Sequence, residues 1–374
     1  MKIGVDARPL AYAGNGNARY LFDMLRGAES GHDFVLYSHR PIHSDYRSTL
    51  DRLGVSFRID QSWTSRAGLL FLNFRLPGWL KEDLCDAYWG SLSMLPFFYK
   101  QRVQIPSMVN FHDLNAFVAA DTMTKANALQ HGLTNGHTLR NADRVLCLSQ
   151  TTANDIARFF PAVKNKLEVV YPGIELKPIR PIAPEGTPGK LRHFYLMVGT
   201  IEPRKNQNTV IDAYLKLKQE LTSKHKLPPL VIVGRKGWGA DVLFERLSSG
   251  ILEKDGIYYI AGASDAVLEW CYKNSSLYLF PSVHEGFGLP ILEAAFRGIP
   301  LALSDIPIFR EVGGESAFAA PFDIQAWQEI LRKPPKKAPA FNKKVWSIEN
   351  RAKKIMQIAR EIAGIRTTGR KQDS

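Results

Sequence analysis

Short apolar runs alternate with longer amphipathic stretches along most of the chain. Each run has the length and composition of a strand buried in a parallel sheet, and the stretches between the runs have helical spacing. In the N-terminal half this predicts strands at residues 2–5, 33–37, 55–58, 106–111, 144–148 and 167–171, with helices after residue 16 and at 121–139 and 150–160. Strands that alternate with helices favour a parallel, doubly wound sheet.

The alternation breaks between Leu176 and Leu191, where four prolines and two glycines fall close together. Such a stretch is typical of a linker between domains. From residue 193 the alternation restarts, with strands expected at 194–198, 230–233, 257–260, 277–280 and 301–304, and helices at 207–221, 242–252, 265–273, 290–297 and 324–331. We therefore expect a first domain at 1–176, a linker at 177–192 and a second doubly wound domain at 193–345.

A last helix is predicted at about 348–363, and residues 346–374 form a separate C-terminal segment. Apolar residues recur along one face of this helix at Ile348, Ala352, Ile355, Ile358, Ala359 and Ile362. This stripe must pack against another surface. The spacing alone leaves open whether that surface belongs to the N-terminal domain or to the preceding domain.

One stretch combines a buried strand, a glycine-bearing turn and a helix start. The strand at 277–280 is followed by Glu285, by Gly286 and Gly288, and by a helix that starts near Pro290. This order points backbone N–H groups and the positive end of a helix at one place, which suits a phosphate. Glu285 and Glu293 flank the turn, and carboxylates accept hydrogen bonds from sugar hydroxyls. Each glutamate on its own is equally consistent with ordinary compensation of the helix dipole.

Further polar residues follow other predicted strands. Arg204 and Lys205 lie in the loop after the strand at 194–198, which begins at Gly199, and Asn206 is placed to cap the next helix. His112 and Asp113 close the strand at 106–111. Ligands of open α/β sheets bind at the carboxyl ends of strands. A surface role for the Arg-Lys pair and a core role for the histidine are the alternatives.

The segment from Glu285 to Glu293 resembles the E-x7-E motif of retaining GT-B glycosyltransferases, in particular glycosyltransferase family 4. The resemblance implies two Rossmann-like domains that face each other across a cleft, and transfer of a sugar from a nucleotide to a hydroxyl with retention. It also implies that the last helix, in the segment 346–374, crosses back to the N-terminal domain. It implies that Glu293 holds the ribose and that Glu285 contacts the donor sugar or its phosphate side. The donor-binding motif residues would be Gly199, Arg204, Lys205, Glu285, Gly286, Phe287, Gly288, Leu289 and Glu293.

The same resemblance extends to the N-terminal half. Gly16 opens a turn similar to the glycine loop that lies beside the donor diphosphate in the family, although Asn17 departs from the usual apolar residue. A plain strand-to-helix turn is the alternative. The resemblance places His112 at the sugar-transfer site, with Asn17 and Asp113 on the acceptor side. The catalytic residues implied are His112, Glu285, Arg204 and Lys205.

Charge and composition limit the classes of molecule that the protein is expected to bind. The chain has a net charge of +13, from 49 basic and 36 acidic residues, which favours anionic partners such as nucleotide phosphates. A basic, proline-rich stretch at 332–344 is either a solvated face or a contact with an anionic membrane leaflet. We expect a nucleotide-sugar donor, a glycan or polyprenyl-linked acceptor, and no nucleic acid.

Several features are expected to be absent. The sequence contains no Asp-x-Asp, so we expect no metal and no cofactor, and the cations of the 199–206 loop would neutralise the diphosphate. The most apolar run, at 67–74, is too short to span a membrane. Residues 2–5 enter a strand at once, which leaves no room for a signal peptide. Cys85, Cys147 and Cys271 each lie in an apolar segment, as reduced core thiols of a cytoplasmic protein do.

The sequence leaves the donor base and sugar open. The segments around residues 199–206 and 285–293 look most like bacterial mannosyltransferases of the family, which favours GDP-mannose, with UDP-glucose and dTDP-rhamnose as alternatives. Two other classes also remain: a nucleotide-sugar epimerase with the same architecture, and a nucleic-acid-binding or membrane-binding protein whose cleft is inactive.

Overall fold

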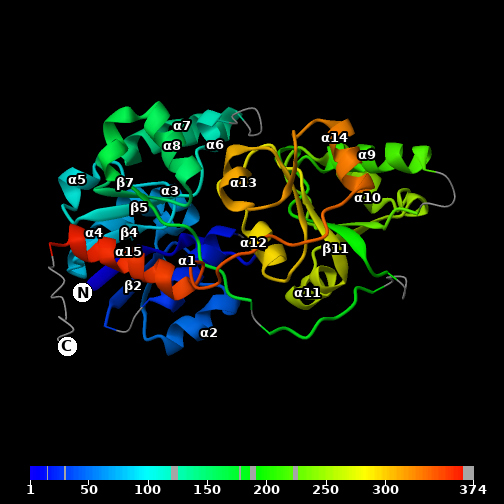
Figure 1. Cartoon of the computed structure of the whole chain (residues 1–374). Coiled ribbons are helices and arrows are strands. Elements are labelled where there is room, and N and C mark those ends of the chain that lie inside the picture. Colours follow the sequence, from blue (N-terminus) through cyan, green and yellow to red (C-terminus); the bar gives the residue numbers. More distant parts are fainter. Residues whose placement is uncertain are drawn as a thin grey trace, which may run out of the picture. The chain divides into compact units, whose positions relative to one another are not determined.

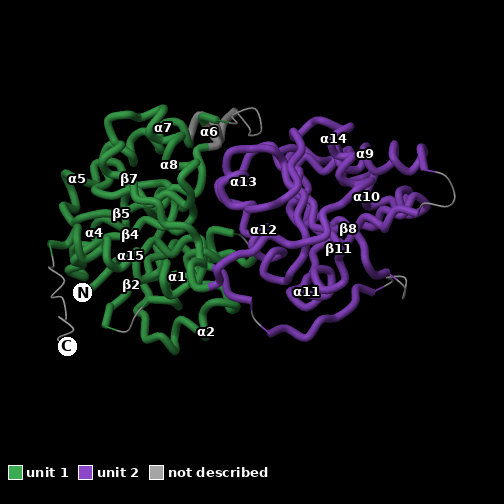
Figure 2. The backbone as a smooth tube through the Cα atoms, in the orientation of Figure 1, with its two compact units in different colours: residues 1–173, 344–374 green, residues 174–343 purple. Residues whose placement is uncertain are grey.

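The computed structural model of the chain describes residues 1–14, 16–28, 31–118, 125–176, 178–185, 191–221 and 226–364. Two compact units divide the chain (Figure 2). Unit 1 comprises Met1–Gly173 and Lys344–Ser374, and unit 2 comprises Ile174–Lys343. The chain therefore leaves unit 1 after residue 173 and returns to it at residue 344.

Unit 1 is built on a parallel sheet with the strand order β3-β2-β1-β4-β5-β6-β7. In the described residues its strands are β1 (Lys2–Asp6), β2 (Asp33–Ser38), β3 (Ser56–Ile59), β4 (Ala87–Gly90), β5 (Ser107–Phe111), β6 (Arg144–Cys147) and β7 (Leu167–Val169). The helices are α1 (Gly16–Gly27), α2 (Ser44–Arg52), α3 (Gly68–Leu70), α4 (Leu76–Glu82), α5 (Tyr99–Arg102), α6 (Asn115–Val118), α7 (Lys125–Asn141), α8 (Gln150–Phe159) and α15 (Ile348–Ile362) (Figure 1). Part of the helix predicted at 121–139 lies outside the described residues.

The strand β4 is absent from the elements that the pattern predicts, yet it lies in the middle of the sheet. It pairs with β1 on one side and with β5 on the other. Its residues Tyr88 and Trp89 are fully buried. The strand has the sequence Ala-Tyr-Trp-Gly, which lacks a β-branched residue and includes an alanine and a glycine, both depleted in strands. Without it the two halves of the sheet would have no hydrogen-bonded connection.

The helix α15 packs against α1 in unit 1. Its buried side chains, which belong to the same hydrophobic core as those of α1 and β1, are Ile348, Ala352, Ile355, Met356, Ile358 and Ala359. Two glycines let the start of this helix approach closely. A Cβ atom on Gly27 would lie 2.5 Å from Ile348 Cγ2, and one on Gly173 would lie 2.6 Å from Ile348 Cα. Any side chain at either glycine would displace the helix start.

Unit 2 contains a second parallel sheet with the order β10-β9-β8-β11-β12-β13. In the described residues its strands are β8 (Phe194–Val198), β9 (Leu230–Gly234), β10 (Ile257–Ala261), β11 (Ser275–Phe280), β12 (Leu301–Ser304) and β13 (Ala317–Ala319). The helices are α9 (Gln207–Glu220), α10 (Asp241–Ser248), α11 (Asp265–Asn274), α12 (Leu289–Ala295), α13 (Pro307–Val312) and α14 (Ile324–Arg332). Sequence patterns did not reveal β13, a three-residue edge strand.

Short one-turn and irregular helical segments complete the chain. They are the 3-10 helices η1 (Arg8–Ala11), η2 (Trp63–Arg66), η5 (Pro161–Lys166), η6 (Pro203–Lys205) and η7 (Glu253–Asp255), and the π-helical segment η3 (Phe71–Arg75). The three cysteines are free and buried, as predicted. Burial raises the pKa of the Cys147 and Cys271 thiols to about 12. Within the described residues, no helix has both the length and the apolar character that a membrane crossing requires.

The topology of unit 2 brings two loops together. The strands β8 and β11 are neighbours and run parallel, so the loops that follow them leave the same edge of the sheet. The loop after β8 carries Arg204 and Lys205, and the loop after β11 carries Glu285. A main-chain hydrogen bond joins the loops, from Val283 N to Arg204 O at 2.9 Å.

Candidate active site

Glu285 is the centre of an ion-pair cluster in unit 2. Its Oε2 lies 2.8 Å from Arg204 Nη1, and its Oε1 lies 2.5 Å from Lys205 Nζ. Ser282 Oγ donates a further hydrogen bond to Oε1 at 2.8 Å. The Glu285 side chain is almost fully buried, and the two cations keep only 21% and 13% of their side-chain surface exposed. Both carboxylate oxygens are therefore held by positive or polar partners.

The electrostatics of the cluster keep Glu285 ionised. Burial on its own would raise the pKa of this carboxyl. The charges of Lys205 and Arg204 lower the pKa, as do the hydrogen bonds from Lys205 and Ser282, and the result is a pKa of about 2. The folded-state pKa lies below the value of about 4.3 that is usual for a glutamate in an unfolded chain. The cluster thus presents two cations that share one permanently ionised carboxylate, and Arg204 Nη2 also pairs with Glu202 Oε1 at 2.6 Å.

Asn206 ties the cation-bearing loop to the rest of unit 2, but it does so differently from the prediction. It stands at the N-cap position of α9 in a left-handed conformation, with φ of 53°, and its side chain makes no capping bond. Instead, Nδ2 donates to Pro281 O at 3.1 Å and to Pro321 O at 2.7 Å. Its Oδ1 accepts from Thr209 Oγ1. The amide therefore fastens the loop across the ends of β11 and the segment before α14.

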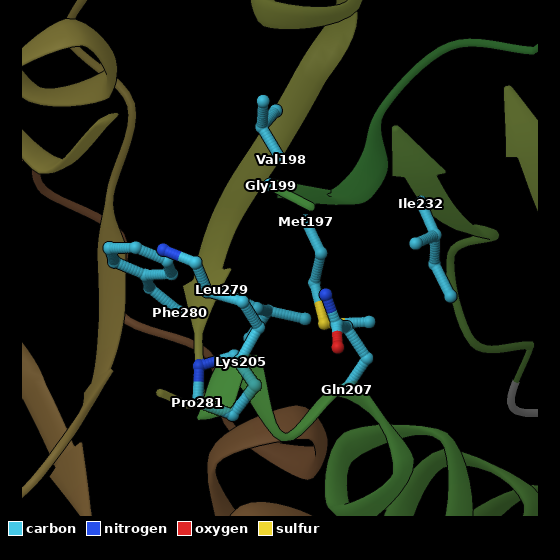
Figure 3. Close-up of a pocket in the computed structure, with 9 residues that line it drawn as sticks. All are labelled: Met197, Val198, Gly199, Lys205, Gln207, Ile232, Leu279, Phe280 and Pro281. Atoms are coloured by element: carbon cyan, nitrogen blue, oxygen red, sulfur yellow. The ribbon is translucent and has the colours of Figure 1, made fainter. Parts of the chain in front are cut away.

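The end of β8 requires an unusually close approach of two main chains. A Cβ atom on Gly234, at the end of β9, would lie only 2.0 Å from Gly199 O. Lys205 Nζ lies 5.0 Å from the centre of the Phe280 ring, close enough for a cation–π interaction. Figure 3 shows Lys205, Gln207 and Phe280 around the small hollow at this edge. The remaining lining residues are Met197, Val198, Gly199, Ile232, Leu279 and Pro281.

Glu293 lies in a different environment, inside α12. Its side chain is buried, and Tyr272 OH donates a hydrogen bond to its Oε2 at 2.8 Å. Burial first, and then the charge of Glu293, raise the pKa of the Tyr272 phenol well above its usual value, so it stays a donor. The pKa of the Tyr278 phenol is also raised well above its usual value. Burial is the largest cause, followed by the charge of Glu293 and then that of Glu285.

A partly buried arginine also contacts Tyr272. The guanidinium carbon of Arg297 lies 4.6 Å from the centre of the Tyr272 ring. Its Nη1 donates to Glu293 O at 2.8 Å, and its Nη2 pairs with Glu269 Oε2 at 2.6 Å. Sequence reasoning missed Tyr272 and Arg297. Only the spacing of four between Glu293 and Arg297 gave a signal, and nothing in the sequence pairs α11 with α12.

The turn between the two glutamates depends on Gly288. This residue has φ of 93°, and a Cβ atom on it would meet Phe309 Cε1 at 3.1 Å. A side chain would therefore be strained by the backbone and crowded by the core. Phe287 is buried, whereas Gly286 and Leu289 are partly exposed. Pro290 stands in the first turn of α12, as its missing N–H predicts.

The site residues predicted in the N-terminal half all lie in unit 1. His112 Nε2 donates to Ser91 O at 2.9 Å, and the edge of its ring meets Tyr20 at a centroid distance of 5.5 Å. Burial lowers the pKa of His112, so the ring is neutral near neutral pH. Gly16 begins α1 and Asn17 follows it in the first turn. Because Tyr20 belongs to the same helix, this turn and His112 are linked through one aromatic contact.

The structure thus joins some of the predicted residues directly and leaves others separate. Arg204, Lys205 and Glu285 are in contact, and Glu293 lies in α12 of the same unit. Asp113 is partly exposed after β5. Among the residues that the structure describes, no three His, Cys, Asp or Glu side chains are grouped so that they could hold a metal ion.

The chain contains two parallel α/β sheets, and the second sheet carries the cation-bearing loop and the pair of glutamates. This combination is that of a GT-B type of glycosyltransferase. The solved structures agree on the fold. Sucrose-phosphate synthase from Thermosynechococcus elongatus aligns with a TM-score of 0.70 and 16% identity, over 98% of this chain and 100% of that chain. HepE from Anabaena, in complex with UDP and glucose, aligns with a TM-score of 0.68 and 15% identity, over 96% and 100%.

The sequence comparisons give the family. The family model described as "Glycosyltransferase Family 4" matches residues 14–177. The model described as "Glycosyl transferases group 1" matches residues 183–351. The two matches together cover most of the chain. The protein is a GT-B glycosyltransferase of family 4 (group 1).

The curated relatives include several proteins named as mannosyltransferases. The chain is 28% identical to O-antigen chain mannosyltransferase B of Escherichia coli, over 68% of this chain and 67% of the relative. It is 23% identical to O-antigen chain mannosyltransferase RfbU of Salmonella typhimurium, over 88% and 89%. It is 32% identical to the serotype-specific mannosyltransferase WbdA of Escherichia coli, of which it spans about a quarter.

Proposed function

We propose that this glycosyltransferase moves mannose from GDP-mannose to a hydroxyl of a glycan or polyprenyl-linked acceptor during O-antigen synthesis. The names of the relatives support the sugar and the pathway. The observation that carries the proposed chemistry is the cluster of Arg204, Lys205 and Glu285. It holds two cations in fixed positions at the carboxyl edge of a sheet, where the departing nucleoside diphosphate needs positive charge.

In this proposal each group has one role. Arg204 and Lys205 stabilise the negative charge that develops on the diphosphate as the glycosidic bond breaks. Glu285 holds both cations and faces the donor sugar side, and Glu293 accepts hydrogen bonds from the ribose hydroxyls. His112, neutral and hydrogen-bonded to Ser91, contacts the sugar or the acceptor in unit 1, with Asn17 and Asp113 near it.

We further propose that the transfer retains the anomeric configuration and needs no metal. The second carboxylate of the pair, Glu293, is buried and hydrogen-bonded to Tyr272, which suits a binding role better than that of a nucleophile. A front-side attack in which the leaving phosphate takes the acceptor proton requires no further protein carboxylate. The fixed cations of the 199–206 loop supply the charge that a metal ion would otherwise supply. Activity should therefore survive a chelator.

The experiment that tests the donor is a hydrolysis screen over nucleotide sugars with the purified protein. GDP-mannose should give the highest rate of release of its nucleoside diphosphate, and the anomeric configuration of the product from a soluble acceptor can be read by NMR. A UDP-linked donor is the main alternative, because the structural neighbour HepE was solved with UDP and glucose. Preferred turnover of UDP-glucose or dTDP-rhamnose would overturn the donor assignment while leaving the class of reaction intact.

An acceptor linked to a lipid has to be met at a membrane, and we propose that the protein works at the inner face of the cytoplasmic membrane. The basic stretch at 332–344 is one candidate for the contact, since its lysines 333, 336, 337, 343 and 344 are all exposed. Electrostatic binding of this kind weakens steeply with salt. Co-sedimentation with anionic vesicles at low and high ionic strength measures it.

A further inference from the structure

Unit 2 contains a cavity at the amino edge of its sheet, opposite the edge that carries the Glu285 cluster. The cavity has a volume of about 350 Å³ and lies between the end of α11, the start of β11 and the segment that joins α12 to β12 (elements labelled in Figure 1). Its lining residues Ser275 and Ser276 begin β11, and Pro300 stands directly before β12. The six residues of β11 span roughly 20 Å, so the cavity is separate from the Glu285 cluster. A cavity of this size is large enough for a small molecule.

The cavity wall holds one carboxylate between two cations. Glu269 Oε2 lies 2.6 Å from Arg297 Nη2 and 3.0 Å from Arg297 Nε. Glu269 Oε1 lies 3.7 Å from Lys273 Nζ. The Glu269 side chain keeps only 9% of its surface exposed, whereas that of Lys273 keeps 54%. One buried anion therefore faces two cations, and the charged side chains of the wall carry an excess of positive charge.

Lys273 is the less satisfied of the two cations. Within the described residues its ammonium group makes no hydrogen bond, since the 3.7 Å to Glu269 Oε1 is too long for one. Lys273 stands in the last turn of α11 and Arg297 follows α12, so the negative ends of both helices favour cations here. The helix dipoles explain the charge but leave the N–H groups of Lys273 available to an anion in the cavity.

Hydroxyl groups and apolar atoms complete the wall. Ser275 Oγ donates to Tyr272 O at 2.9 Å, and Ser276 Oγ donates to His193 O at 3.1 Å. Each hydroxyl has used its proton in this way, so its oxygen is left as an acceptor for the hydroxyl of a ligand. Ile299 adds apolar surface beside them, which suits the C–H face of a sugar ring. The wall thus combines cations, hydroxyl oxygens and apolar atoms.

Two residues of the cavity wall also hold Glu293. Arg297 Nη1 donates to Glu293 O at 2.8 Å, and Tyr272 OH donates to Glu293 Oε2 at 2.8 Å. The guanidinium carbon of Arg297 lies 4.6 Å from the centre of the Tyr272 ring. A ligand that binds Arg297 from the cavity is therefore separated by a single side chain from the glutamate of the E-x7-E motif.

We propose that this cavity binds a phosphorylated sugar, with its phosphate on Lys273 and Arg297 and its hydroxyls on the two serines. A phosphate matches the excess positive charge of the wall and the fork of the guanidinium. The bound anion fixes Arg297 and, through it, the Tyr272–Glu293 pair, so it strengthens nucleotide binding. The binding itself rests on the geometry of unit 2, whereas the link to the nucleotide rests on the proposed function of Glu293.

Calorimetry of the full chain with glucose 6-phosphate tests the binding, with glucose and inorganic phosphate as comparison probes. The sugar phosphate should bind more tightly than inorganic phosphate, and glucose should not bind. Lys273→Gln should weaken the affinity for glucose 6-phosphate about ten-fold, because charge-assisted hydrogen bonds to the phosphate are lost. Lys218→Gln is the matched control and should leave the affinity unchanged, since Lys218 is a partly exposed lysine that pairs with Asp255 elsewhere on unit 2.

Arg204→Ala separates the cavity from the donor site, whose cations also attract phosphate. This variant should keep the binding of glucose 6-phosphate that Lys273→Gln weakens. The reverse result would assign the ligand to the donor site and overturn the proposal. No binding by the wild type, or an affinity for inorganic phosphate equal to that for glucose 6-phosphate, would overturn it as well.

The link to Glu293 is tested by titration of the nucleoside diphosphate with and without saturating glucose 6-phosphate. The nucleotide should bind a few-fold more tightly in its presence, and the nucleotide should strengthen sugar-phosphate binding by the same factor, because coupling is reciprocal. Independent affinities would show that Arg297 carries no link. Lys273→Gln should leave donor hydrolysis in the absence of sugar phosphate unchanged. A wild type that binds glucose 6-phosphate but hydrolyses no nucleotide sugar would contradict the proposed function and leave the cavity assignment in place.

Discussion

The two glutamates that flank the Gly286–Gly288 turn differ in the partners that surround them. Glu285 is held by Arg204, Lys205 and Ser282, so most of its hydrogen-bonding capacity serves two cations. Glu293 accepts from a neutral phenol, Tyr272, and lies on a helix rather than in a loop. In the proposed function the first glutamate organises positive charge for a departing diphosphate, and the second accepts hydrogen bonds from the ribose. Two identical residues eight positions apart can therefore be separated by experiment.

The largest effect should come from Glu285→Gln. This change removes the anion that Arg204 and Lys205 share and leaves Lys205 without that carboxylate, while Arg204 still pairs with Glu202 Oε1 at 2.6 Å. We expect turnover of the donor to fall roughly 10³-fold. Steady-state kinetics with the preferred donor measures it. Glu293→Gln is the matched control, and if it lowers turnover at saturating donor as much as Glu285→Gln does, the distinction between the two glutamates is wrong.

Arg204→Ala should have the next largest effect. The guanidinium acts on charge that grows in the transition state, so kcat should fall roughly 10²-fold or more, with a smaller change in KM. Arg246→Ala, which removes an arginine paired with Asp212 on the surface of the same unit, serves as the control and should leave both constants unchanged. A change confined to KM would remove Arg204 from the catalytic step.

The pH dependence of stability offers a third way to test the Glu285 cluster. The pKa of this carboxyl is about 2 in the folded protein and higher in the unfolded chain. Its contribution is therefore fully present above about pH 4.3 and is lost as the pH falls toward 2. Denaturant titrations between pH 5 and about 2 should show a steeper loss in the wild type than in Glu285→Gln. Parallel curves for the two proteins would contradict the low pKa.

Glu293→Gln should weaken binding more than catalysis. The loss of charge-assisted hydrogen bonds to ribose hydroxyls should cost about 1–3 kcal/mol of affinity for the free nucleoside diphosphate. Calorimetry with the ribonucleotide and with its 2′- and 3′-deoxy analogues measures it. The wild type should prefer the ribonucleotide and the variant should not. Unchanged affinity in the variant would remove Glu293 from the ribose site.

Tyr272→Phe should give the smallest effect. It deletes one hydrogen bond to Glu293 without deleting the carboxylate, so it should weaken nucleotide binding by about 0.5–1.5 kcal/mol and reduce the preference for the ribonucleotide. Tyr214→Phe removes a buried hydroxyl that donates to Pro228 O, outside the site, and controls for lost stability. If the two variants bind the ribonucleotide equally well, Tyr272 has only a structural role.

The sequence predicted the fold where the apolar runs were long and stood between clear helices. The strand at 194–198 and that at 301–304 were predicted at their observed bounds, β8 and β12. The strands β4 and β13 were missed because Ala-Tyr-Trp-Gly and Ala-Phe-Ala contain no β-branched residue, and their alanines and glycine are depleted in strands. The bonds of Asn206 were also missed, since an asparagine before a helix favours a cap, whereas its carbonyl partners come from residues 75 and 115 positions away.

The candidate site shows the same division. Arg204, Lys205, Glu285 and Glu293 follow strands or flank a turn, and the motif they form is recognisable from residue types and spacing. Their pairing required the parallel neighbours β8 and β11, which only the sheet order gives. Tyr272 reaches Glu293 from another helix across 21 positions, and no periodicity or composition signals such a contact.

The position of α15 has a consequence for the order in which the protein can be completed during synthesis. The core of unit 1 includes six side chains of this helix, and the start of the helix lies against Gly27 and Gly173. A ribosome must therefore make all of unit 2, residues 174–343, before the first unit can close its core. Unit 2 is continuous in the chain and can fold first. Until α15 has been made, unit 1 is incomplete, and the face of α1 that α15 covers stays exposed to solvent. Truncation after residue 343 should leave a nascent chain whose N-terminal half is sensitive to protease and a target for chaperones.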